Sequence, residues 1–116
     1  MKFMLMFRSV TGREVDVPPC KELAAMGDFV NDLTKSGVLL ATEGLHPSAK
    51  GARVRLTGGK VAVKDGPFTE SKELIAGFAL VQVKSKDEAV ELATRFLKVA
   101  GEGESEIREV IEGKTE

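Results

Sequence analysis

Apolar residues along the chain fall into short runs and two longer periodic stretches, which together predict alternating strands and helices. Residues 2–8 form a short, almost continuously apolar run, so we expect a buried strand there. Across residues 20–36 the apolar positions recur at spacings of three and four, which is one face of a helix, and Gly37 is a natural end for it. Residues 38–45 then predict a second strand that ends before Pro47.

The next segment predicts a β-hairpin. Residues 53–57 and 60–64 have strand-like alternation and flank Gly58-Gly59, a pair typical of a two-residue turn. The register that this turn implies places four apolar residues on one face, with Leu56 opposite Val61 and Val54 opposite Val63. Arg53 and Arg55 then lie on the other face. Asp65 comes two positions after Val63. Because alternate residues of a strand point to the same side, Asp65 also lies on the apolar face.

The second half of the chain repeats the strand and helix pattern. Residues 76–84 predict a mostly apolar strand, and Ser85 with Glu88 forms a capping box that opens a helix ending near Gly101. Residues 106–111 predict a short final strand. The order strand, helix, strand, hairpin, strand, helix, strand predicts an α+β ferredoxin-like sandwich, with two helices on one face of an antiparallel sheet.

Both faces of the predicted long strands are apolar, and this pattern points to a dimer. In the first strand one face carries Phe3, Leu5 and Phe7, and the other carries Met4 and Met6. In the strand at residues 76–84 one face carries Phe78 and Leu80, and the other carries Ala79, Val81 and Val83. Two helices cover only one face of a sheet, so the other face would meet water in a single chain. We therefore expect a symmetric homodimer, packed sheet to sheet, that encloses a barrel-like interior suited to a ligand.

Composition narrows the class of protein. The 116 residues are expected to form a single domain, residues 1–116. A net charge of −1 without Trp or Tyr argues against nucleic-acid binding. No apolar run approaches the ~18 residues of a membrane span, and the single cysteine, Cys20, excludes an internal disulfide, so we expect a cytoplasmic protein. One His and one Cys far apart supply no metal-binding cluster, and no cofactor is expected.

Asp65 begins the most tightly specified corner of the sequence. Gly66 can adopt backbone angles closed to other residues, and Pro67 fixes its own φ. A carboxylate at such a corner either caps the turn by hydrogen bonding or belongs to a binding or catalytic site, and the sequence is compatible with both roles. From the parity of the hairpin we expect the Asp65 side chain to be partly buried, bonded to N–H groups of its own turn, and to face a cavity.

Other residues could accompany Asp65 in a site. Glu43 lies at a strand end and either borders solvent or contacts a ligand. His46 is the single imidazole, and it either occupies a loop or acts in acid–base chemistry. Arg55, with its neighbour Arg53, could bind an anion or form the polar face of the hairpin. Cys20 lacks an activating partner in the sequence.

Several segments together resemble a known family. They are Met1-Lys2-Phe3-Met4-Leu5-Met6, Gly37-Val38-Leu39, Glu43-Gly44-Leu45 with Pro47, Asp65-Gly66-Pro67-Phe68-Thr69-Glu70-Ser71-Lys72-Glu73, and Gly77-Phe78. Over nearly the whole chain the sequence resembles the DGPF subgroup of the YCII-related proteins. The resemblance implies a dimeric α/β-barrel of ferredoxin-like fold in a bacterial cytoplasmic protein, some relatives of which are encoded beside, or fused to, sigma factors. Wider relatives are suspected enzymes that pair a His on the first helix with an acid, whereas residues 20–36 contain no His here.

Two functions follow as hypotheses. The first is a dimeric module that binds a small ligand or a protein partner, in a regulatory setting that the sigma-factor association suggests. The second is a cofactor-independent enzyme doing acid–base chemistry on a small molecule, with Asp65 as base or orienting group and His46 or Glu43 assisting. An enzyme would need Asp65 within reach of a second polar group in a concave site.

Overall fold

The computed structural model describes residues 1–8, 20–46, 48–67, 75–101 and 103–112, with side chains of the first helix described from residue 24 onward. The elements are β1 (Lys2–Arg8), α1 (Cys20–Lys35), β2 (Leu39–Gly44), the short 3-10 helix η1 (Ser48–Lys50), β3 (Ala52–Thr57), β4 (Lys60–Asp65), β5 (Gly77–Gln82), α2 (Lys86–Ala100) and β6 (Glu104–Glu109). This is the predicted order of strands and helices.

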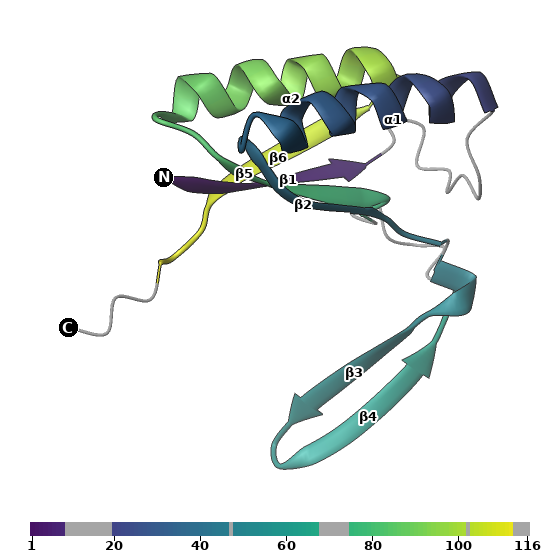
Figure 1. The fold of residues 1–116 in the computed structure, drawn as a ribbon. Helices are drawn as coiled ribbons and strands as arrows, with labels where there is room; N and C mark the ends of the chain where they lie inside the picture. Colours follow the sequence, from purple (N-terminus) through teal and green to yellow (C-terminus); the bar gives the residue numbers. More distant parts are fainter. Residues whose placement is uncertain (9–19, 47, 68–74, 102, 113–116) are drawn as a thin grey trace.

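Four strands form one antiparallel sheet in the order β2-β5-β1-β6, and β3 pairs with β4 in a separate two-stranded sheet. Figure 1 shows α1 and α2 side by side on one face of the four-stranded sheet, with the β3–β4 hairpin projecting away below the other face. The two helices and the antiparallel sheet fit the predicted α+β ferredoxin-like fold. None of the helices in the described part of the chain is long and apolar enough to cross a membrane.

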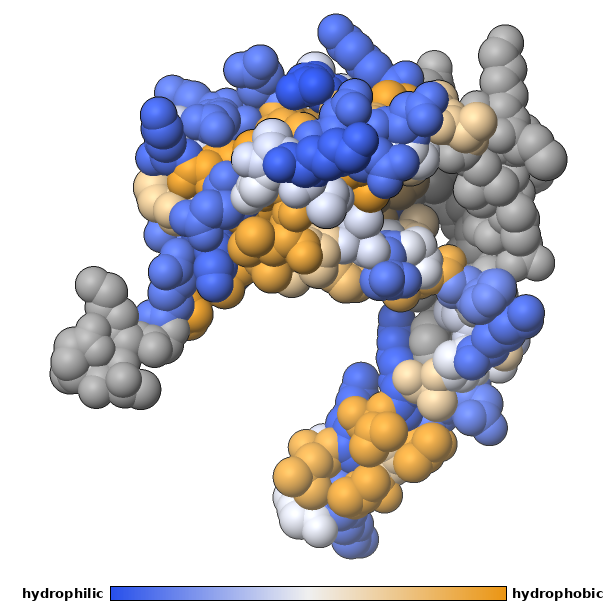
Figure 2. Space-filling model, viewed as in Figure 1, coloured by the Kyte–Doolittle hydropathy of each residue, from blue (hydrophilic) through white to orange (hydrophobic). Residues whose placement is uncertain are grey.

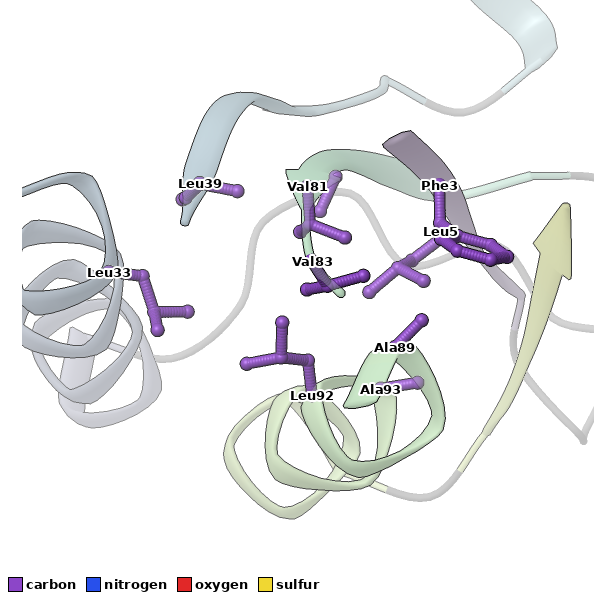
Figure 3. Close-up of a cluster of buried hydrophobic side chains, with 10 residues drawn as sticks. Phe3, Leu5, Leu33, Leu39, Val81, Val83, Ala89, Leu92 and Ala93 are labelled. Atoms are coloured by element: carbon purple, nitrogen blue, oxygen red, sulfur yellow. The ribbon is translucent and has the colours of Figure 1, made fainter. Parts of the chain in front are cut away.

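The core lies between the sheet and the helices. Its buried side chains are Phe3, Leu5, Leu33, Leu39, Ala79, Val81, Val83, Ala89, Leu92 and Ala93. Figure 3 shows Leu92, Ala89 and Ala93 of α2 directed at Val83, which follows β5, and at side chains of the sheet such as Leu5. Ala89 and Ala93 are small, so α2 approaches β1 and β6 closely. Between the helices, the rings of Phe29 and Phe96 meet edge to face with centroids 4.7 Å apart.

Local signals in the sequence account for the ends of α2. Ser85 is the N-cap, and its hydroxyl accepts a hydrogen bond from the backbone N–H of Glu88 at 3.2 Å. The carboxylate of Glu88 in turn accepts from the backbone N–H of Lys84 at 3.5 Å. Gly101 closes the helix with a φ of 106°, in a region that favours glycine, and its N–H donates to the carbonyl of Leu97.

The final strand begins earlier than predicted. The pattern placed it at residues 106–111, whereas β6 spans Glu104–Glu109 and Ile111 is 94% exposed. Pairing with β1 sets these limits, because Arg8 lies opposite Glu104 and Phe3 lies opposite Glu109. The apolar residues near the end of the chain suggested a strand at residues 106–111. The ends of a strand are set instead by the residues that it pairs with on the neighbouring strand.

Candidate functional site

The helix-free face of the four-stranded sheet carries an apolar strip between charged edges. Antiparallel partners point to the same side of a sheet, so the register defines two rows of side chains on this face. The rows are Glu43–Phe78–Met6–Glu106 and Ala41–Leu80–Met4–Arg108, each taken in the order β2, β5, β1, β6. Its apolar members on β1 and β5 are half-buried, and Figure 2 shows apolar side chains gathered on this underside of the sheet. We call Met4, Met6, Phe78 and Leu80 the sheet strip.

A network of charges lines the β6 edge of this face. The Arg8 guanidinium pairs with Glu104, with Nε 3.2 Å from Oε1, and also donates to Glu106. Glu106 accepts a second hydrogen bond from Arg108, whose Nη1 lies 3.1 Å from Oε2. The hydrogen bond from Arg108 and then that from Arg8 lower the pKa of the Glu106 carboxyl below its usual value. Glu106 is therefore held in its charged form beside two cations.

The sequence alone does not single out this network. The spacing of two residues was the available signal, because alternate residues of a strand lie on one face. It relates Glu104, Glu106 and Arg108 of β6. Arg8 belongs to β1, nearly a hundred residues away in the chain, so sequence spacing could not indicate its contact with Glu106.

Glu43 lies at the opposite edge of the same face. It occupies β2 across from Phe78, and its side chain is exposed. Close backbone packing holds this end of the strand, because a Cβ atom at Gly77 would lie 2.9 Å from the carbonyl oxygen of Glu43. Three strand spacings separate Glu43 from Glu106, so their backbones stand about 14 Å apart across the apolar strip.

Asp65 and His46 lie at the junction between the sheet and the hairpin. Asp65 is the last residue of β4, opposite Ala52, and the next residue, Gly66, packs against the carbonyl of Ser48. His46 is exposed and lies two residues before Ser48. Asp65 and His46 therefore both lie near η1, and β2, which carries Glu43, ends just before His46.

The Asp65 side chain is exposed in the single chain, so the expected partial burial is wrong for the chain by itself. The register of the hairpin is confirmed, with Leu56 opposite Val61 and Val54 opposite Val63. Asp65 does share a face with Val61 and Val63, but that face is not buried, because every residue of β4 is exposed. Residues 68–74 of the corner motif lie outside the described residues.

Arg55 is not brought together with the other candidates. It lies opposite Ala62 on the face of the hairpin that points away from Val61 and Val63. Arg53 shares this basic face, opposite Lys64. Cys20 is the first residue of α1, and its side chain lies outside the described part of the structure.

The described residues contain no group of three or more His, Cys, Asp or Glu side chains placed to hold a metal ion. Two open grooves are lined wholly by described residues. The first lies between the end of α1 and the start of α2, beside Asp87 and Glu91, and the second lies at the end of β6 beside Ile111. Neither groove includes Glu43, His46 or Asp65.

Comparison with known proteins gives a family match over almost the whole chain. The family model of the YCII-related domain matches residues 1–114. A similar sequence is an uncharacterised protein, R00369, of Rhizobium meliloti (strain 1021), which is 33% identical over 85 residues. That alignment covers 73% of this chain and 66% of the relative.

Proposed function

Because the chain belongs to the YCII-related domain family, we propose that it acts as a homodimeric module that binds a small ligand between two sheets. Within the family, Asp65-Gly66-Pro67-Phe68 supports placement in the DGPF subgroup. The observation that carries the proposal is the sheet strip, an apolar surface on the face of the sheet opposite the helices, with charged groups at both edges.

A second copy is the cover that this face requires. An antiparallel sheet can leave one face to water when that face is polar, but here it carries the apolar sheet strip. Two copies that meet sheet to sheet across a two-fold axis bury both strips in one self-complementary interface, which gives the dimeric α/β-barrel. Apolar burial drives such an association, while the charges at the edges stay in contact with water.

The ligand is a small, largely apolar molecule with a polar group at one end. Phe78 and Met6 offer an apolar floor, and Met side chains adapt to ligands of different shape. Glu43 at the β2 edge, with His46 and Asp65 at the adjoining junction, supplies the polar contacts. Glu106 contributes less, since Arg8 and Arg108 already pair with its carboxylate.

Binding is better supported than catalysis. Glu43, His46 and Asp65 are exposed in the single chain, and acid–base chemistry calls for groups enclosed with their substrate. Helix α1 also contains no His. A regulatory role in the bacterial cytoplasm, next to a sigma factor, rests on the family resemblance alone.

The test is to identify what the purified protein holds. The chain is purified under native conditions and denatured, and released small molecules are measured by mass spectrometry. We expect a molecule that is retained by the parent and by Glu109→Gln, and that is reduced at least several-fold in Glu43→Gln. A preparation without a retained molecule, and without a thermal shift across a library of small apolar acids and amines, would contradict ligand binding. Turnover of such a compound that is lost in both Asp65→Asn and His46→Gln would favour the enzyme instead.

A further inference from the structure

The β3–β4 hairpin has one apolar and one basic face. Val54, Leu56, Val61 and Val63 share the apolar face, and their exposed fractions are 65–71%. We call these four residues the hairpin strip. The opposite face carries Arg53, Arg55, Lys60 and Lys64. Figure 2 shows the apolar side of the hairpin next to the open space beneath the sheet, which the sheet strip also borders.

Within its own chain the hairpin extends away from the body of the protein. It forms a separate two-stranded sheet, and Figure 1 shows it projecting below the four-stranded sheet. The radius of gyration is 16.0 Å, against about 13 Å for a compact domain of this length. An isolated two-stranded hairpin is marginally stable in water. Four large apolar side chains on such an arm therefore call for a packing partner.

The size of the hairpin strip argues for an interface that includes a second surface. Burying one fully exposed aliphatic side chain removes about 60–120 Å² of apolar area, so the hairpin strip, whose side chains are 65–71% exposed, supplies roughly 160–340 Å². A stable interface buries about 800 Å² on each partner. The sheet strip is the other apolar surface that borders the same open space, and it too spans two adjacent six- or seven-residue strands. Together the two strips supply more of this area than either strip does alone.

Charge also favours contact between the hairpin and the body of another copy. Residues 52–65 carry four cationic side chains and one carboxylate, a net charge of +3. Since the whole chain has a net charge of −1, the other 102 residues carry −4. Opposite net charges on arm and body attract, and in a two-fold dimer the attraction acts twice.

From these observations we infer that the hairpin is an arm that reaches to a second copy of this chain. Its strip extends the interface begun by the sheet strip, and the two arms are related by the two-fold axis. This inference rests on the proposed dimer. Asp65 shares the face of the hairpin strip, so the arm places this carboxylate at the margin of the interface.

Backbone hydrogen bonds tie the base of the hairpin to η1. The N–H of Gly66 donates to the carbonyl of Gly51 at 2.9 Å, and Gly51 donates in turn to Ser48 at 2.9 Å. These bonds fix both ends of the hairpin to η1. The two strands of the arm are therefore held together where they leave η1.

Thiol labelling tests the arm directly. In a Cys20→Ser background, single cysteines are introduced as Val61→Cys in the hairpin strip, Ala62→Cys on the basic face and Leu80→Cys in the sheet strip. Light scattering first identifies a dimeric and a monomeric condition, the latter reached by dilution or by Leu80→Glu. We expect maleimide to react with Val61→Cys at least tenfold more slowly in the dimer than in the monomer, while the matched control Ala62→Cys reacts equally fast in both.

Each other outcome overturns the inference in a recognisable way. Equal rates for Val61→Cys in a dimer that protects Leu80→Cys would leave the sheet-to-sheet dimer standing and remove the arm. Slow labelling of Val61→Cys in both conditions would show that the hairpin packs on its own chain. A single-chain mass at every concentration would remove the dimer, and the arm with it.

Discussion

Gly66 lies so close to Ser48 that a Cβ atom at this position would overlap the Ser48 carbonyl oxygen. That oxygen belongs to η1, so the end of β4 packs directly against the turn that precedes β3. Glycine is required here for its small size rather than for an unusual φ. The contact defines how the hairpin leaves the body of the protein.

Replacing Gly66 by Ala should therefore displace the hairpin or destabilise the fold. The clash is with backbone, which cannot move aside as a flexible side chain can, and overpacking of this kind costs about 1–3 kcal/mol. The matched control is Gly51→Ala, where the nearest atom would be Ser48 O at 3.6 Å, an ordinary contact. Chemical denaturation should show a loss of stability for Gly66→Ala and almost none for Gly51→Ala; equal losses would disprove the close packing.

The charge network on β6 predicts a pH dependence of stability. The pKa of Glu106 in the folded protein lies below its ordinary value of 4.5, because of Arg108 and Arg8. The unfolded chain then binds the proton more readily, so stability rises with pH across this window. The stabilisation is present above 4.5 and is lost as pH falls through the lowered pKa.

The variant that isolates this effect is Glu106→Gln. Urea unfolding from pH 7 to pH 2.5 should show the variant to be less stable than the parent at pH 7, with the difference closing in acid. The effect should shrink in high salt, because Glu106 and Arg108 are exposed to solvent. Glu109→Gln on the same strand is the control, and a pH-independent difference for Glu106→Gln would contradict the role of its charge.

Asp65 should contribute little to the stability of the single chain. Its side chain is exposed, and exposed substitutions usually change the free energy of unfolding by less than about 0.5 kcal/mol. We therefore expect Asp65→Ala and Asp65→Asn to melt within a degree or two of the parent under monomeric conditions. A loss of about 1–3 kcal/mol would instead reveal a satisfied, buried acceptor.

Local sequence signals predicted the elements and the hairpin register. Gly58 and Gly59 both have positive φ, 58° and 78°, which is what a two-residue hairpin turn demands. Ser85 and Glu88 marked the start of α2 because capping involves residues only three positions apart. These features depend on neighbours in sequence, so the sequence alone was sufficient for them.

The candidate site depended on contacts that sequence spacing does not encode. Asp65 shares a face with Val61 and Val63 as predicted, yet parity within a hairpin says nothing about what covers that face. The pairing of Arg8 with Glu106 joins the first and last strands of the sheet, and only tertiary structure brings them together. The placement of Glu43 opposite Phe78 likewise depends on the order of the strands.

The proposed dimer depends on the sheet strip, and one substitution can test this surface without disturbing the fold. Leu80→Glu places a charge in the middle of the proposed interface, where burial without a partner is costly. We expect this variant to be monomeric with an unchanged far-ultraviolet circular dichroism spectrum. Val90→Glu, on an exposed position of α2, serves as the control and should keep the mass of the parent.

The most direct test is the mass of the unmodified chain in solution. Light scattering on a size-exclusion column at micromolar concentration should return twice the chain mass of 12.5 kDa. A mass equal to one chain across the whole concentration range would contradict the proposed dimer, and with it the ligand site between two sheets.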